Sequence, residues 1–111
     1  MTINDHIHFV LHKLIDYYSP QKVFLFGSQA REDANENSDI DFFVIKESNE
    51  PRHKRALNFR KELRGHNFYP VDILVYTPTE FENESSIKGT ISYQVTKEGK
   101  LLYGTESGTP N

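Results

Sequence analysis

The sequence predicts a single α+β domain, α/β-like in its order of elements, in which helices flank a small mixed sheet. Its 111 residues are enough for one modest hydrophobic core and too few for two. Apolar residues recur at helical spacing in some segments and form short continuous runs in others, a pattern typical of helices packed on a sheet. Aromatic residues make up 13% of the chain, which argues against disorder.

The elements are expected in the following order. Residues 3–18 form a helix, because their apolar side chains recur at helical spacing and Thr2 with Asp5 resembles a capping box. Short apolar runs predict strands at 22–26, 39–45 and 71–76. A helix at 51–65 provides the crossover that lets the second and third strands lie parallel as neighbours. Two short helices, 79–84 and 87–98, and an edge strand at 101–103 complete the domain.

The predicted domain therefore spans residues 1–103, and the small, polar residues 104–111 are expected to form a flexible tail. The chain has no cysteine, which excludes disulfides, thiolate zinc sites and a cysteine nucleophile. The N-terminal residues lack the pattern of a signal peptide, and no apolar stretch approaches the ~20 residues of a membrane-spanning helix. A cytoplasmic protein is expected.

Charge is distributed unevenly along the chain, although the net charge is only −3. Residues 32–50 contain seven acidic side chains and one basic one, whereas residues 51–66 contain six basic side chains and one acidic one. The overall acidity disfavours non-specific nucleic-acid binding, but the basic segment remains available to phosphates or an acidic partner.

Two acidic residues in an apolar strand form the first candidate site. Asp39 and Asp41 are separated by one residue, so on a strand they point to the same side with Cα atoms roughly 6.5–7 Å apart. Their repulsion and desolvation must be offset, and a divalent cation is a common counter-charge. A solvated position at the mouth of the strand explains the pair equally well.

A third carboxylate favours the metal interpretation. Asp72 lies in the apolar strand 71–76, and parallel pairing with strand 39–45 would place it near Asp41. Gly27 and Ser28 close the first strand, where a glycine allows close backbone approach and the following amides can form an anion-binding turn. Three carboxylates beside such a turn are the arrangement of a two-metal phosphoryl-transfer site.

These residues resemble the signature of the DNA polymerase beta-type nucleotidyltransferase superfamily: Gly27-Ser28, then Asp39-x-Asp41, then an aspartate in a later strand. In so short a chain they resemble its minimal nucleotidyltransferases, the antitoxins paired with HEPN-domain toxins. The resemblance implies that Gly27 and Ser28 hold the triphosphate of ATP, with Arg31 as a further phosphate contact. It also implies that Asp39, Asp41 and Asp72 ligate two Mg²⁺ ions and that Asp72 helps to take the acceptor's proton.

The resemblance implies Mg²⁺-dependent transfer of AMP from ATP to a hydroxyl, expected to be a tyrosine of a HEPN-family toxin encoded nearby. Since no acceptor domain is seen, the pocket would be completed by that partner or by another copy of this chain. Two alternatives stay open. The chain could be a non-catalytic antitoxin that silences its partner by covering it, or it could modify a small molecule.

Two weaker features have bland explanations. His8, His12 and Asp16 share one side of the first helix and could bind zinc, but an exposed set of three usually remains solvated. The basic segment 52–64 could be a docking surface for an acidic partner or RNA, or simply a solvated helix face.

Overall fold

The computed structural model describes residues 2–27, 39–66 and 69–104. The elements, in chain order, are α1 (Ile3–Tyr18), β1 (Lys22–Phe26), β2 (Ile40–Ile45), the 3₁₀ helix η1 (Arg52–Lys54), α3 (Leu57–Glu62), β3 (Val71–Tyr76), α4 (Pro78–Glu84), α5 (Ile91–Glu98) and β4 (Lys100–Tyr103). The expected α+β architecture, with helices on a small mixed sheet, is confirmed.

The first helix begins and ends where its sequence provides caps. Thr2 and Asp5 form a reciprocal capping box, in which each side chain accepts a hydrogen bond from the other residue's backbone N–H. Ser19 closes the helix in the left-handed conformation with φ of 46°, and Pro20 follows. The helix buries the predicted apolar side, and His6 is fully buried with it.

The sheet has four strands in the order β3-β2-β1-β4. Strand β2 runs antiparallel to β1 and parallel to β3, and β4 pairs antiparallel with the other edge of β1. The carboxyl end of β1 and the amino ends of β2 and β3 therefore meet at one end of the sheet. This arrangement confirms the predicted parallel pairing across the crossover.

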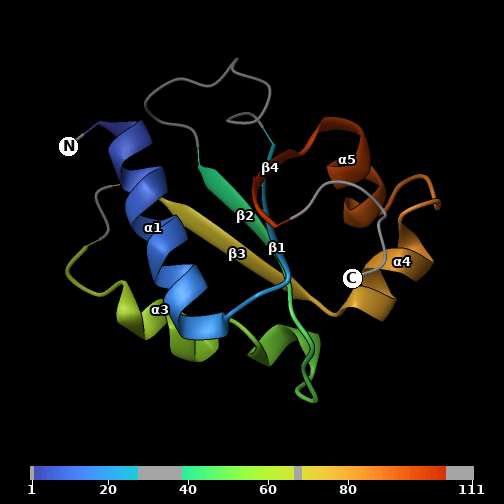
Figure 1. Ribbon diagram of the computed structural model, residues 1–111, viewed down its shortest axis with the longest axis horizontal. Coiled ribbons are helices and arrows are strands. Elements are labelled where there is room, and N and C mark those ends of the chain that lie inside the picture. Colours follow the sequence, from blue (N-terminus) through green and yellow to red (C-terminus); the bar gives the residue numbers. More distant parts are fainter. Residues whose placement is uncertain (1, 28–38, 67–68, 105–111) are drawn as a thin grey trace.

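Helices cover both faces of the sheet and create two cores. On one face, α1 and α3 pack over side chains of β1, β2 and β3, and Val10, Leu14 and Phe59 of the two helices are completely buried. On the other face, α4 and α5 pack over an aromatic cluster that includes Phe43 and Tyr76. Figure 1 shows these two helical layers on opposite sides of the strands.

Two helix predictions were wrong in detail. The segment 51–65 is not one continuous helix: η1 and α3 are separated by a turn at Arg55 and Ala56. Arg55 is buried there, and its guanidinium bonds to backbone carbonyls at Glu50 and Val75, which local helical spacing does not predict. The last helix begins at Ile91 rather than at residue 87, because Thr90 caps it.

Among the described residues, no helix has the length and apolar character needed to cross a membrane.

Candidate active site

Two of the predicted acidic residues lie opposite each other on neighbouring strands. The parallel register pairs Asp41 of β2 with Asp72 of β3. Asp41 lies two residues before the buried Phe43, and Asp72 lies two residues before Leu74. Because residues two apart on a strand point to the same side, both carboxylates belong to the sheet face that α4 and α5 cover farther along. Asp39 precedes β2 by one residue and is exposed. The structure thus brings all three aspartates to the same end of the sheet.

The absence of a side chain at Gly27 leaves room for the Asp41 carboxylate. It follows β1 with φ of +76°, and a Cβ atom at this position would lie 2.6 Å from Oδ2 of Asp41. A side chain would therefore both strain the backbone and displace the carboxylate. The group that lies close to Gly27 is the Asp41 carboxylate of this chain, and the predicted approach of Gly27 to a phosphate stays a prediction.

Asp41 is the electrostatically unfavourable member of the group. Burial, followed by the charges of Asp72 and Asp39, raises the pKa of its carboxyl from 3.8 to about 6. In the described part of the chain, no basic side chain forms an ion pair with Asp39 or Asp41. The site consequently has surplus negative charge that a cation would relieve.

Asp72 has a basic neighbour that the sequence did not single out. Nη2 of Arg60, on α3, lies 4.0 Å from Oδ1 of Asp72, and the two side chains are about half exposed. Arg60 also lines a pocket of about 290 Å³ with Leu63, Tyr69, Pro70 and Val71, beside the start of β3. Nothing in the spacing of the six bases in this region distinguishes Arg60, because the contact depends on how the crossover folds.

The donor set fits a hard divalent cation in its chemistry. Three carboxylates offer only oxygen atoms, which Mg²⁺ prefers, and their mutual repulsion already destabilises the ionised form of Asp41. As the side chains stand, no group of three or more metal-binding residues is close enough to enclose an ion anywhere in residues 2–27, 39–66 and 69–104. The same finding covers His8, His12 and Asp16, which are exposed on α1. Ser28 and Arg31 lie outside the described residues.

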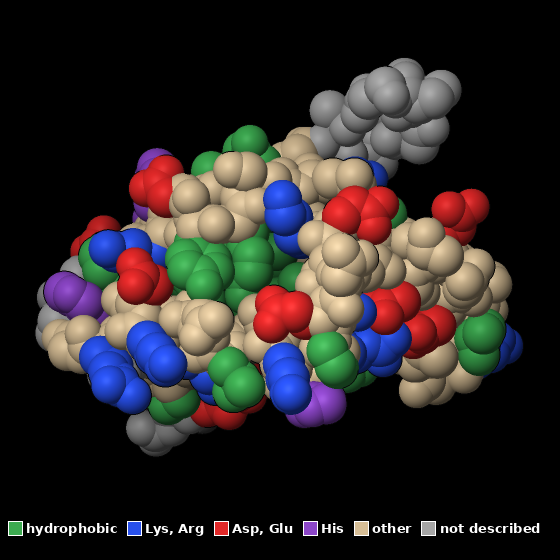
Figure 2. Space-filling view, turned by 90° about the horizontal axis from the view of Figure 1, so that it is seen from below, with side chains coloured by type: hydrophobic (Ala, Val, Ile, Leu, Met, Phe, Trp, Pro, Cys, Tyr) green, Lys and Arg blue, Asp and Glu red, His purple; other side chains and the backbone are tan. Residues whose placement is uncertain are grey.

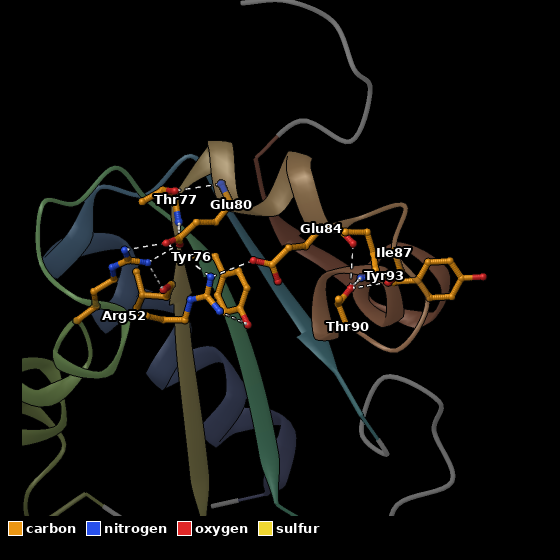
Figure 3. A network of polar contacts seen from close by, with 10 residues as sticks. Arg52, Tyr76, Thr77, Glu80, Glu84, Ile87, Thr90 and Tyr93 are labelled. Atoms are coloured by element: carbon orange, nitrogen blue, oxygen red, sulfur yellow. Dashed lines mark hydrogen bonds and ion pairs between the residues drawn. The ribbon is translucent and has the colours of Figure 1, made fainter.

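A polar network holds α4 against the crossover on the far side of the same core. Arg55 donates two hydrogen bonds to the carboxylate of Glu80, which also caps α4 by accepting from the backbone N–H of Thr77. The hydrogen bond from Arg55 lowers the pKa of Glu80 to about 2. Arg52 lies over the ring of Tyr76 and pairs with Glu84 at 3.0 Å. Figure 3 shows how these side chains face one another. Two of the six predicted docking bases therefore serve the fold.

Comparison with known proteins places this geometry in a family. The family model described as polymerase beta, nucleotidyltransferase matches residues 10–107, which include all the candidate site residues. The chain belongs to this family. The match confirms the enzyme class expected from the sequence, a nucleotidyltransferase. The search of curated proteins found no significant match.

Solved structures share the fold. One is a toxin–antitoxin structure with AMP-PNP, which is 23% identical with a TM-score of 0.62 over 95% of this chain and 76% of that chain. Another is a mutant of the toxin–antitoxin MntA-HpeT, 22% identical with a TM-score of 0.59 over 89% of this chain and 73% of that chain. A second mutant of that pair matches with the same identity and TM-score over 90% and 73%. At these identities the likeness establishes the fold.

Proposed function

We propose that this protein is an antitoxin that transfers AMP from ATP to a hydroxyl of a partner toxin, in a reaction that requires Mg²⁺. The observation that carries the proposal is the register that sets Asp41 against Asp72 beside Gly27, in a chain of the nucleotidyltransferase family. The choice of ATP and of a toxin is supported by the structural neighbours, which are toxin–antitoxin proteins, one with AMP-PNP. The proposed acceptor is a tyrosine of a HEPN-family toxin.

In the proposed reaction, the acceptor oxygen forms a bond to the α-phosphorus of ATP. The bond from this phosphorus to the oxygen that bridges to the β-phosphate breaks, and pyrophosphate leaves. Asp72 is half exposed and accepts the proton of the acceptor hydroxyl, directly or through water. Asp39 and Asp41, together with Asp72, would hold the two Mg²⁺ ions, and Gly27 and Ser28 would hold the triphosphate.

Bound Mg²⁺ would neutralise the triphosphate and lower the pKa of the acceptor hydroxyl. The remaining work falls to residues of the chain. Gly27 leaves room for the Asp41 carboxylate, and the rigid pairing of β2 with β3 fixes the spacing between Asp41 and Asp72. The aromatic core beneath them keeps this end of the sheet rigid, since Phe43 is completely buried.

The proposal is tested by incubating the protein with ATP, Mg²⁺ and the toxin encoded beside it. Intact-mass spectrometry is expected to show one or more AMP units on the toxin, mapped to tyrosine by fragmentation. Asp39→Asn and Asp72→Asn should each prevent both the adduct and the neutralisation of the toxin. If these variants neutralise it at equal dose and the toxin stays unmodified, the chain acts as a binding antitoxin and the proposed transfer is wrong.

A further inference from the structure

The exposed side of the crossover carries basic side chains around one apolar side chain. Leu57 and Lys61 are four residues apart and share one side of α3, while Lys54 ends η1 and Arg64 follows the end of α3 by two residues. Leu57 is 53% exposed, and the three bases are exposed as well. The opposite side is buried through Phe59 and Leu63. We refer to the four residues as the α3 stripe.

The bases of the α3 stripe differ from their neighbours in being free to bind something else. Arg52 and Arg55 pair with Glu84 and Glu80 within the fold. By contrast, no ion pair to a base of the stripe occurs among the residues that the structure describes. Helix α3 lies at the lower side of Figure 1 and so faces the viewer in Figure 2, where Lys and Arg side chains gather along one side of a hollow with a hydrophobic floor.

The stripe is continuous with the candidate active site. Arg60 lies on the same helix, between the stripe and β3, and its guanidinium is 4.0 Å from the Asp72 carboxylate. The pocket of about 290 Å³ beside Arg60 is lined by apolar groups and Tyr69. This volume lies at the lower end of the ~300–1,000 Å³ typical of small-ligand sites, and it is large enough to hold one side chain of a partner. A segment that covers the stripe would therefore reach the Asp72 end of the sheet.

We propose that the α3 stripe is the docking surface for the acceptor protein, and that it binds an acidic segment with an apolar side chain placed on Leu57. The charge of the stripe favours acidic side chains, and an exposed leucine among bases favours a protein over RNA, since an apolar side chain of a partner protein can cover it whereas phosphate contacts cannot. The overall charge of −3 also disfavours RNA. The inference rests on the proposed function for its purpose, but docking itself needs neither ATP nor metal.

The experiment measures binding without chemistry. A fluorescein-labelled peptide of glutamates around one leucine and one tyrosine is titrated with the protein in chelator, and anisotropy is recorded against a counterpart in which lysines replace the glutamates. The acidic peptide is expected to bind, and more weakly as salt rises. The double variant Lys61→Glu/Arg64→Glu should bind it at least about tenfold more weakly. Leu57→Ala should weaken binding several-fold and leave the salt dependence unchanged.

The matched control is Lys88→Glu/Lys97→Glu, which changes net charge equally at two exposed positions on the α4–α5 side. It should bind as the parent protein does, within about twofold. Equal weakening in both double variants would overturn the proposal, because the effect would then be one of total charge. Tighter binding of a labelled oligouridylate, lost in the stripe variant, would overturn it in favour of RNA. Melting curves of the two double variants establish that both are folded.

Docking and transfer fail in different ways. If the acidic peptide binds through the stripe but the toxin never acquires AMP, the proposed transfer is wrong and the docking surface stands. If the toxin is modified equally by the parent protein and by Lys61→Glu/Arg64→Glu at limiting toxin concentration, the docking proposal is wrong and the transfer stands.

Discussion

Replacing Asp41 by asparagine should stabilise the metal-free protein while preventing its chemistry. Burial and the charges of Asp72 and Asp39 raise the pKa of Asp41 from 3.8 to about 6, so the fold favours the protonated form. An asparagine resembles that form in shape and lack of charge. The variant should therefore remove an electrostatic cost that the ionised aspartate imposes on the folded state at neutral pH.

The size of the effect follows from the change in pKa. A rise from 3.8 to about 6 corresponds to up to about 3 kcal/mol at neutral pH. Because the side chain is only partly buried, solvent screening reduces this to about 1–2 kcal/mol. For a domain of 111 residues, such a gain raises the melting temperature by about 4–8 °C.

The dependence on pH gives the prediction its sign. Since the folded state binds the proton of Asp41 more tightly than the unfolded chain does, stability falls as the pH rises from about 4 through 6. Thermal unfolding in chelator, at constant ionic strength, should show little difference between Asp41→Asn and the parent protein near pH 4. The full difference should develop by about pH 7. Adding Mg²⁺ should then stabilise the parent protein more than the variant.

The control is Asp16→Asn, at an exposed position on α1, where the same exchange should alter stability by less than about 0.5 kcal/mol. A difference between Asp41→Asn and the parent protein that is the same at every pH would contradict the electrostatic reasoning. Unfolding of the variant at room temperature would show that Asp41 is a structural residue and that the candidate site is misassigned.

Two further substitutions test neighbouring contacts. Gly27→Ala should lower the free energy of unfolding by about 1–2 kcal/mol and abolish stabilisation by Mg²⁺, since the new Cβ would lie 2.6 Å from Oδ2 of Asp41. The loss should be smaller in an Asp41→Ala background, and unfolding titrations of the four proteins of this double-mutant cycle measure the difference. Glu80→Gln should cost about 3 kcal/mol at pH 7, because Arg55 is buried against it. Since the pKa of Glu80 is lowered to about 2, this stabilisation should disappear as the pH falls from about 4.5 toward 2, and a loss that persists there would refute the ionic origin.

Local sequence signals predicted the elements well where a single chain segment determines them. The capping box of Thr2 and Asp5 and the short apolar runs of the strands were confirmed, because these features depend on neighbours in the sequence. The crossover was predicted as one helix and is broken at Arg55, since that guanidinium finds its partners in Val75 and Glu80, twenty or more residues away. Long-range contacts of this kind leave no trace in local spacing.

The pairing at the centre of the candidate site was predictable because it depends only on two strands and the crossover between them. The two aspartates in apolar strands and the length of the crossover were enough to expect Asp41 beside Asp72, and the register confirmed that pairing. The contact of Gly27 with Asp41 and the position of Arg60 were not predictable, because they depend on how a turn and a helix are packed in space. The roles of these residues in catalysis remain predictions.

The two charge clusters of the sequence have different physical meanings once the chain is folded. At the end of the sheet, burial and the charges of Asp72 and Asp39 raise the pKa of Asp41, so bound cations would reduce the cost of ionising it. The basic segment divides into two arginines that bind α4, the buried Arg55 and the exposed Arg52, and a stripe that faces solvent. Arg60 lies at the boundary, within reach of Asp72. An acidic partner that covers the stripe would neutralise positive charge close to the three aspartates. Docking should therefore raise the affinity of the aspartates for divalent metal, and by linkage bound metal should raise the affinity for the toxin.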